Sequence, residues 1–432
     1  MPDYAAATTP ESDFHSQLGP VLSAERPVGP PIGRVAPHLI DAIMVDVIHD
    51  GEVVPSEFLV DKDGAPIPPE VFRPHYELDR DWGASLVAGR LAGALGLPAW
   101  YKVNIARVLM DFGRFPGTTH ESAEYLRRFA INYPFSEVLS YDQRRGVLEG
   151  YYDATSRELE RHIRGRILKI AVHTYDRLNA SGTVRPAVSL VTRSLAYQTS
   201  SRLPQGVFDP LYPDLLAEFT ADRILTDRIS LDLEKGGIPV AHNYPYCLPE
   251  GSVEVRSQVW FFFTFLRRRF EEQHPETRDL PQFQMVWDLL LDTNLRSSEA
   301  DMLRSYIHLY RHAPTGQEEL FRKARLAYDR VGAFIAADDQ RVVNDYRFWG
   351  GRPSSMGLEV RKDVVWSFDA DGRPVGPRVE NANKVAEAIA AAVLVYLNCD
   401  HPERVTREDF LDRPTTWFGG GGDGLGEPGR LG

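Results

Sequence analysis

The sequence predicts an α/β fold, with a mixed, mostly parallel sheet and flanking helices. Short apolar, β-branched runs such as 41–48 and 167–173 alternate with longer segments whose apolar residues recur at helical spacing. Strands that alternate with helices favour a parallel or mixed sheet. A chain of 432 residues, 43% of them hydrophobic, is also long enough to bury a full core.

The first 38 residues are rich in Pro and Gly, most densely at 26–33. This composition does not sustain a helix or a central strand, so we expect residues 1–38 to form an arm laid over the domain. After the arm, the apolar spacing predicts strands at 41–48, 99–112, 167–173 and 186–192, and helices near 82–95, 119–132 and 150–164.

The second half of the chain is mostly helical by its apolar spacing, over 211–235 and again over 254–345. The segment 254–345 is interpreted as a helical insertion that either caps the functional site or forms a homodimer contact. The α/β domain would then comprise 39–253 and 346–400.

The sheet is expected to resume at 355–367, and an Ala-rich helix at 381–397 is expected to pack back on it. The Gly-rich end of the chain, 413–432, superficially resembles a phosphate-binding loop. It lacks the Gly-Lys-Ser/Thr ending, and no strand leads into a helix around it, so we expect a disordered tail.

Two of the predicted strands deliver a histidine where they end. The run at 41–48 is followed by His49 and then by Asp50-Gly51, which favours a turn, and the run from Ile167 ends on His173. A single histidine after a strand is more often a hydrogen-bonded turn residue. In open α/β sheets, however, functional groups gather at the carboxyl ends of strands, and two such histidines indicate a metal site.

Catalytic zinc usually takes three protein ligands, so a third donor should accompany the histidines. The segment before the predicted helix at 82–95 supplies His75, Glu77, Asp79 and Asp81. Both aspartates are close enough to that helix to serve only as its cap. Glu77 lies farther upstream and is the expected ligand, with His75 as the alternative.

Composition excludes several functional classes. A net charge of −12 argues against broad nucleic-acid binding, which depends on clustered Lys and Arg. Cys247 and Cys399 are far apart and form no Cys-x-x-Cys motif, so we expect neither a disulfide framework nor a thiolate zinc site. The start of the chain lacks a secretory signal, and the longest apolar run, 259–266, is too short to cross a membrane. We therefore expect a cytoplasmic protein.

Several motifs, in this order, resemble the N-formylglutamate amidohydrolases, which are zinc hydrolases with a carboxypeptidase-like α/β fold. They are the strand-His motif at His49, an acidic or histidine-bearing segment before a helix, an Arg-Val-Leu-Met-Asp-Phe-Gly-Arg strand at 107–114, and the strand-His-Thr motif at His173. The loop at 236–246 is similar to the family's Asn-x-Pro-Tyr loop. Gly357-Leu-Glu359-Val-Arg361, followed by a terminal helix, completes the match.

The chain departs from the family at two ligand motifs. It reads Ile48-His49-Asp50-Gly51 where the family has Pro-His-Ser-Gly or Pro-His-Ala-Gly. Ala171 stands where the family tends to have an aspartate, two residues before His173. A carboxylate at such a position orients a metal-bound histidine, so the departure leaves the substrate open.

The resemblance implies a Zn²⁺ ion held by His49, Glu77 and His173, and hydrolysis of the amide of a small N-acyl amino acid or short peptide. The resemblance also implies a general base, for which Glu359 and Glu254 lie in similar alternating stretches. Glu254 leads into a bulky apolar run, which favours a structural role, whereas Glu359 has the family's order of strand, glutamate and closing helix.

An acylated amino acid keeps its carboxylates, which arginine binds well. The substrate-binding candidates are Arg107, Arg114, Arg185 and Arg193 at strand ends, with Asn243 and Tyr246 from the family's loop. Two alternatives remain open. One is a carboxypeptidase-like or deacylase activity on another amide, and the other is a catalytically silent scaffold.

Overall fold

The computed structural model describes most of the chain. The predicted helix at 119–132 lies largely outside the described residues, as do the Gly-rich tail at 413–432 and the start of the N-terminal arm. The described residues are 14, 16–116, 130–194, 209–213, 216, 219–249, 251–347, 349 and 352–400.

A seven-stranded sheet forms the centre of the molecule, in the order β1-β3-β2-β4-β7-β5-β6. Neighbours are parallel from β3 through β2 and β4 to β7, and again between β5 and β6. The pairs β1–β3 and β5–β7 are antiparallel. This confirms the predicted mixed, mostly parallel sheet. The strands are β1 Leu22–Glu25, β2 Ile43–Val47, β3 Trp100–Val103, β4 Leu168–Tyr175, β5 Val188–Val191, β6 Val240–His242 and β7 Ser354–Arg361.

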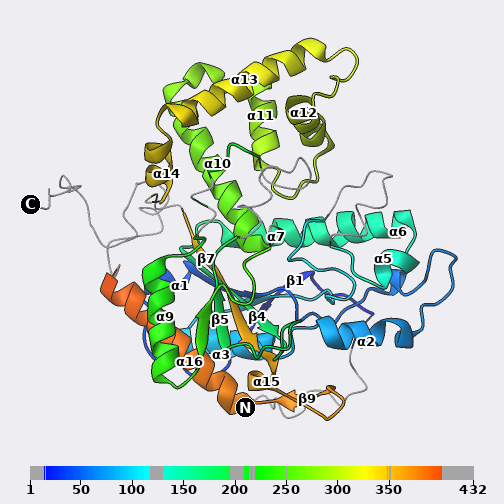
Figure 1. The fold of residues 1–432 in the computed structure, drawn as a ribbon, viewed down its shortest axis with the longest axis vertical. Coiled ribbons are helices and arrows are strands. Elements are labelled where there is room, and N and C mark those ends of the chain that lie inside the picture. The colour runs from blue at the N-terminus through cyan, green and yellow to red at the C-terminus, as the bar shows by residue number, and fades with distance from the viewer. Residues whose placement is uncertain are drawn as a thin grey trace, which may run out of the picture.

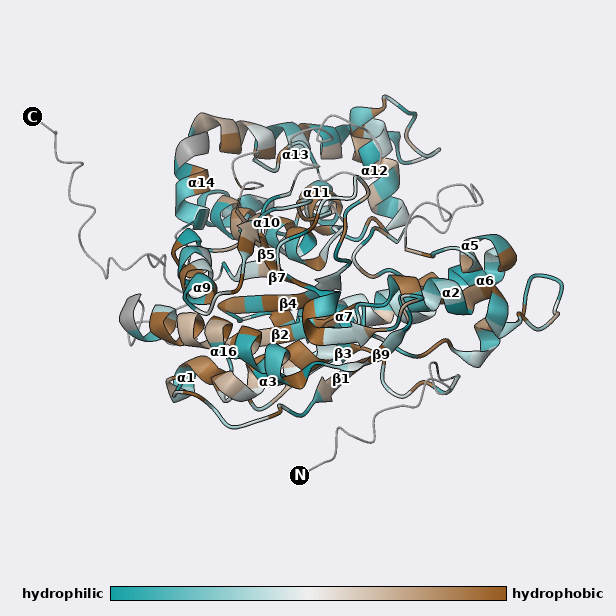
Figure 2. Ribbon diagram, turned by 60° about the horizontal axis from the view of Figure 1, so that its bottom comes forward, coloured by the Kyte–Doolittle hydropathy of each residue, from teal (hydrophilic) through white to brown (hydrophobic). Residues whose placement is uncertain are grey.

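One face of the sheet packs against α3 (Ala84–Leu95), α9 (Arg223–Lys235) and α16 (Val379–Val395). In Figure 2, α3 and α16 lie below the strands and α9 lies to the left of them. Side chains alternate between the two faces of a strand, and every second residue of β2, β4 and β7 belongs to this apolar core. The sequence predicts helical structure over 211–235, and in the structure the helix α9 begins at Arg223.

The start of α10 lies on the opposite face of the sheet. The other helices between β6 and β7, α11 to α14, lie on the same side. Helices α10 to α14 form the upper part of Figure 1, with α10 running from the sheet into that layer. Their aromatic side chains make a second core. The five helices are α10 Val253–Gln273, α11 Pro281–Leu291, α12 Ser298–His308, α13 Glu318–Ala337 and α14 Asp339–Arg347.

The other elements are short. A two-stranded sheet, β8 Trp366–Phe368 and β9 Pro374–Pro377, lies outside the main sheet.

No helix in the described part of the chain has both the length and the apolarity to cross a bilayer. The other helices are α1 Pro37–Ile40, α2 Pro69–Asp79, α5 Phe135–Val138, α6 Tyr141–Gly146, α7 Asp153–Ile163 and α15 Lys362–Val365, with 3₁₀ turns at Ser56–Phe58 and Pro275–Thr277 and π-helical turns at Val147–Tyr152 and Tyr396–Asp400.

The predicted strand at 99–112 is wrong beyond Val103. The chain there leaves the sheet and makes a helical turn in which the amide of Met110 donates to the carbonyl of Ala106 (3.2 Å). The amide of Asp111 then donates to the carbonyl of Ala130, which is distant in sequence (2.7 Å). The apolar residues of this stretch are buried in the core, so their hydrophobicity was a sign of burial and not of a strand.

Two other segments also differ from expectation. The predicted strand at 355–367 ends at Arg361, where the short helix α15 begins. The N-terminal arm contributes β1, which forms one edge of the sheet. An edge strand tolerates the neighbouring prolines because its outer side needs no pairing.

Candidate metal centre

The two histidines meet at one edge of the sheet. His49 follows the end of β2, and His173 lies two residues before the end of β4. Because β2 and β4 are adjacent parallel strands, their carboxyl ends lie side by side. The two rings are 5.0 Å apart between centroids, as the sequence pattern predicts.

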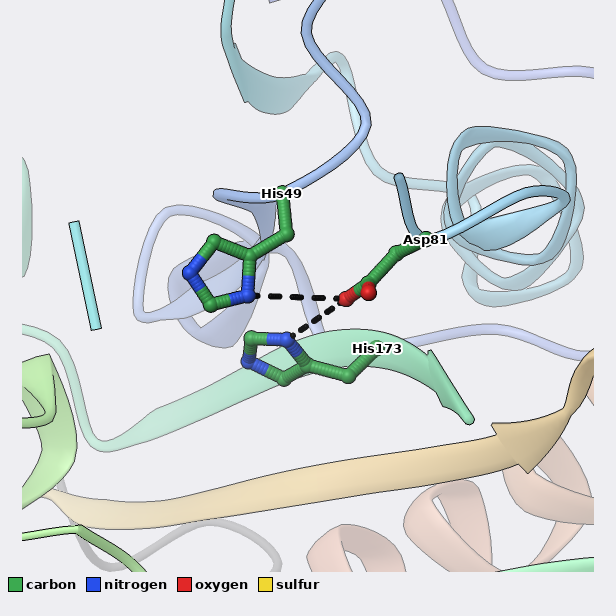
Figure 3. Close-up of side chains that lie close together, drawn as sticks. All are labelled: His49, Asp81 and His173. Atoms are coloured by element: carbon green, nitrogen blue, oxygen red, sulfur yellow. Dashed lines mark hydrogen bonds and ion pairs between the residues drawn. The ribbon is translucent and has the colours of Figure 1, made fainter. Parts of the chain in front are cut away.

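Asp81 completes the cluster, as Figure 3 shows. Its Oδ2 lies 3.0 Å from Nδ1 of His173 and 3.6 Å from Nδ1 of His49. The backbone places it there, because the amide of Asp81 donates to the carbonyl of His49 (3.0 Å). One ligand atom from each of these three residues lies within 4.8 Å of the others, a spacing suited to a metal ion.

The structure brings neither Glu77 nor His75 to this cluster. Both belong to α2, and the ring of His75 packs against Tyr133. The helix α2 continues to Asp79, so the chain reaches His49 only after the helix has ended. Asp81 takes the position that sequence reasoning gave to Glu77, since the point where α2 ends decides which acidic residue reaches the histidines.

Asp111 holds the other side of the His49 ring. Its Oδ1 is 2.8 Å from Nε2 of His49 and accepts a hydrogen bond from the amide of Gly113 (2.9 Å). A Cβ at Gly113 would lie 3.0 Å from Cε1 of His49, so glycine lets this loop lie against the ring. A carboxylate on one ring nitrogen orients the histidine and leaves the other nitrogen for a metal.

Arg107 links the two site aspartates. Its guanidinium lies 3.0 Å from Oδ1 of Asp81 and 3.1 Å from Oδ2 of Asp111. Burial alone would raise the pKa of both carboxyls, but the charge of Arg107 and the neighbouring histidines hold them below the ordinary value. Arg107 is thus bonded to both site aspartates, and its role in substrate binding stays a prediction.

Glu359 lies beside the cluster. It is on β7, directly opposite His173 in the register of the two strands. The hydroxyl of Tyr246 donates to Oε1 of Glu359 (2.6 Å), while Oε2 is buried and has no hydrogen-bond partner among the described residues. Burial raises the pKa of the Glu359 carboxyl, against the opposing charge of His173. This is a suitable setting for a proton acceptor.

Glu254 has a different environment. It lies in the first turn of α10, where its Oε1 accepts a hydrogen bond from the ammonium of Lys169 (2.6 Å). Lys169 also contacts Asp46 at 2.8 Å. The carboxylate of Glu254 is thus committed to an ion pair, whereas Glu359 keeps one oxygen with no partner in the described part of the chain.

The remaining substrate-binding candidates differ in their surroundings. The guanidinium of Arg114 is half-exposed and 3.2 Å from Asp111. Arg185 stacks over Tyr175, at 5.1 Å from the ring centroid. Asn243 has a structural role, since its Oδ1 accepts hydrogen bonds from two backbone amides, one of them that of Arg193 (2.8 Å).

Sequence reasoning missed Asp81 and Asp111 as members of the site. Asp81 was interpreted as a helix cap, and Asp111 was placed in a strand. The available signal was the concentration of charged residues at 79–81 and 107–114, between two histidines that already pointed to a metal.

The comparisons with known proteins are sparse. No protein-family model matches the chain, and no curated protein does. Among solved structures, an N-formylglutamate amidohydrolase from Ralstonia eutropha JMP134 is 11% identical, with 86% of this chain and 95% of that chain covered and a TM-score of 0.42. A gene product from Agrobacterium tumefaciens is 12% identical, with 88% and 98% covered and a TM-score of 0.38. Neither likeness assigns an activity to this chain.

Proposed function

We propose that the protein is a zinc-dependent amidohydrolase that cleaves the amide of a small N-acyl amino acid. The observation that carries the proposal is the cluster of His49, Asp81 and His173, whose ligand atoms lie within 4.8 Å of one another. Two imidazoles and one carboxylate are a donor set that zinc takes in catalytic sites, with the fourth position left to water. The hydrogen bond of His49 to Asp111 adds the outer carboxylate that such a ligand usually has.

A zinc ion bound there would lower the pKa of a water to about 7 and polarise the amide carbonyl. The chain would supply the proton transfers. Glu359 presents its unpartnered Oε2 beside His173, and this oxygen would accept the proton of the attacking water and pass it to the leaving nitrogen. Its raised pKa suits a base that must also give the proton back. Tyr246 would hold Glu359 in position through Oε1.

Arg185 is the best-placed group for a substrate carboxylate. Within the described part of the chain its side chain has no hydrogen bond or ion pair, and its Nε is buried without a partner. The guanidinium lies over the rings of Tyr175 and Tyr246, and Tyr246 is bonded to Glu359. A guanidinium that is unpaired within the described residues and lies over the tyrosine bonded to the proposed base favours an anionic substrate.

Turnover of paired substrates tests the proposal. Zinc-loaded protein would be assayed for free amine release from N-acyl amino acids and from the same compounds with the carboxylate converted to a carboxamide. We expect hydrolysis of the anionic series. Arg185→Met should raise KM for that series by about 10- to 100-fold, as expected for a charged hydrogen bond, and should leave the carboxamide series unchanged.

Arg177→Met is the matched control, because Arg177 lies in the same connection between β4 and β5 but its side chain is mostly exposed. It should behave as the wild type. If the zinc-loaded wild type released amine from no N-acyl amino acid or peptide, the amidohydrolase proposal would be wrong and a silent scaffold would be favoured. If Arg185→Met and Arg177→Met had the same KM for the anionic series, the proposed role of Arg185 would be wrong and the amidohydrolase proposal would be unaffected.

A further inference from the structure

A cavity lies between α7 and the first half of α10. It holds about 410 Å³ of space outside the protein atoms and is partly open to the surface. Leu159 and Ile163, one turn apart on α7, line one side of it, and Val253 and Trp260, two turns apart on α10, line the other. Among the described residues, those that line the cavity include no candidate metal ligand and not Glu359.

Arg256 places a buried positive charge in the wall of this cavity. Only 4% of the residue is exposed, yet its guanidinium makes no ion pair within the described part of the chain. Its Nη1 donates to Oδ1 of Asn294 and its Nη2 to the carbonyl of Phe112 (3.3 Å), while its Nε has no described partner. Both acceptors are neutral. Because buried charges in proteins are normally paired, a cationic wall without a bonded carboxylate points to an anionic ligand.

Arg164 adds a second positive charge where the cavity opens. It follows directly after α7, lines the cavity and is exposed. Its guanidinium lies over the ring of Trp260, 4.8 Å from the ring centroid, and makes no hydrogen bond or ion pair with a described residue. Contact with the ring leaves the N–H groups of the guanidinium available to a planar anion.

Glu160 is the acidic residue among the described residues that line the cavity. It makes no ion pair with either arginine in this part of the chain. Burial raises the pKa of the Glu160 carboxyl, against the charges of Arg256 and Arg164. Two guanidinium groups therefore face one carboxyl whose ionisation burial opposes, and the cavity favours an anion over a cation.

We infer that this cavity is a binding site for a small organic carboxylate with an apolar body, separate from the candidate metal centre. The apolar body would lie between Leu159, Ile163 and Val253, and the carboxylate would meet Arg164 at the opening. Arginine binds carboxylates through two parallel hydrogen bonds. Small-molecule sites typically have about 300 to 1,000 Å³ and mostly apolar walls with a few polar groups, which this cavity matches. Zinc has no part in this inference.

The test is isothermal titration calorimetry on the full chain, stripped of metal so that no carboxylate binds through zinc. The probes are 3-phenylpropionate, its carboxamide and acetate. We expect 3-phenylpropionate to bind, and the carboxamide to bind about 10- to 100-fold more weakly because it lacks the charged hydrogen bonds. Acetate should not bind measurably, because it has almost no apolar surface to bury. No binding of 3-phenylpropionate, or equal affinity for acid and carboxamide, would overturn the inference.

Arg164→Met tests the charge at the opening. It should lower the affinity for 3-phenylpropionate to that for the carboxamide and leave the carboxamide affinity unchanged. Arg161→Met is the matched control, because Arg161 lies near the same end of α7 but is exposed, pairs with Glu158 and does not line the cavity. It should bind as the wild type does. Equal affinities of the two variants for 3-phenylpropionate would overturn the inference.

Ser257→Phe tests the place of the apolar body. Ser257 lines the cavity from α10, so the larger side chain should fill the space and abolish binding, with an unfolding midpoint in urea that shows the variant is folded. Arg164 and Arg161 are exposed, so their variants decide the question if Ser257→Phe does not fold. Binding that Ser257→Phe keeps and Arg185→Met loses would place the carboxylate at the proposed substrate site and overturn the inference.

Discussion

Glu359 and Glu254 show how similar sequence contexts give different chemistry. Both lie in short stretches that alternate in sequence, but the Glu254 carboxylate is paired with Lys169, and Glu359 keeps a buried oxygen that no described residue bonds. A carboxylate committed to an ammonium is a poor proton acceptor, because its pKa is held low. The environment therefore favours Glu359 as the base.

Glu359→Gln should lower kcat by about 10²- to 10⁴-fold while leaving zinc content unchanged, because it removes a general base and no metal ligand. Steady-state kinetics and metal analysis on the same preparation measure both quantities. Glu254→Gln is the comparison, and at saturating zinc it should keep most of its kcat. A Glu359→Gln variant with near-wild-type kcat, beside an inactive Glu254→Gln, would reverse the assignment.

The loop that follows β3 is the element that shapes the site. It carries Arg107 and Asp111, and at Gly113 it passes against the ring of His49. The contact is close enough that a Cβ at Gly113 would lie 3.1 Å from Oδ1 of Asp111 as well as 3.0 Å from the His49 ring. The loop and the histidine must therefore fit together to a few tenths of an ångström.

Gly113→Ala should weaken zinc binding, since the added methyl group displaces either His49 or Asp111 from its present position. Zinc titration with a competing chelator measures the effect. Gly150→Ala is the control, because a Cβ there meets nothing within 4 Å. Equal zinc affinity in the two variants would show that the loop can shift to make room for the methyl group. The close contact of Gly113 with His49 would then have no part in metal binding.

The strands that present the histidines could be predicted because the sequence pattern that identifies each of them lies within the strand and the turn after it. The runs at 41–48 and 167–173 correspond to β2 and β4 with shifts of no more than two residues at either end. Short apolar, β-branched runs and a turn pair after His49 are enough to locate such strands. Glu359 was likewise expected near the site, and the register of β7 places it opposite His173.

The parts of the candidate site formed by Asp81 and by the loop with Arg107 and Asp111 could not be predicted in this way. The course of the loop after Val103 depends on hydrogen bonds to residues around 130, which no local pattern contains. The choice of Asp81 over Glu77 depends on where α2 ends and on a backbone hydrogen bond to His49. These are long-range contacts, and hydrophobic spacing carries no information about them.

Across the whole molecule, the start of α10 joins the helical layer to the sheet face that carries the site. A Cβ at Gly251 would lie 2.3 Å from the amide nitrogen of Phe115, so the chain enters α10 directly against the loop after β3. Glu254 then reaches Lys169 on β4. Whether the layer caps the site or joins two copies of the chain stays a prediction.

The central claim is that His49, Asp81 and His173 bind one zinc ion, and metal content measures it most directly. Metal-free protein would be reconstituted with zinc, freed of excess and analysed as wild type, Asp81→Ala and Glu77→Ala. The account predicts one zinc per chain in the wild type and in Glu77→Ala, and almost none in Asp81→Ala, because Asp81, and not Glu77, lies with both histidines. Zinc retained by Asp81→Ala, or lost from Glu77→Ala, would contradict it.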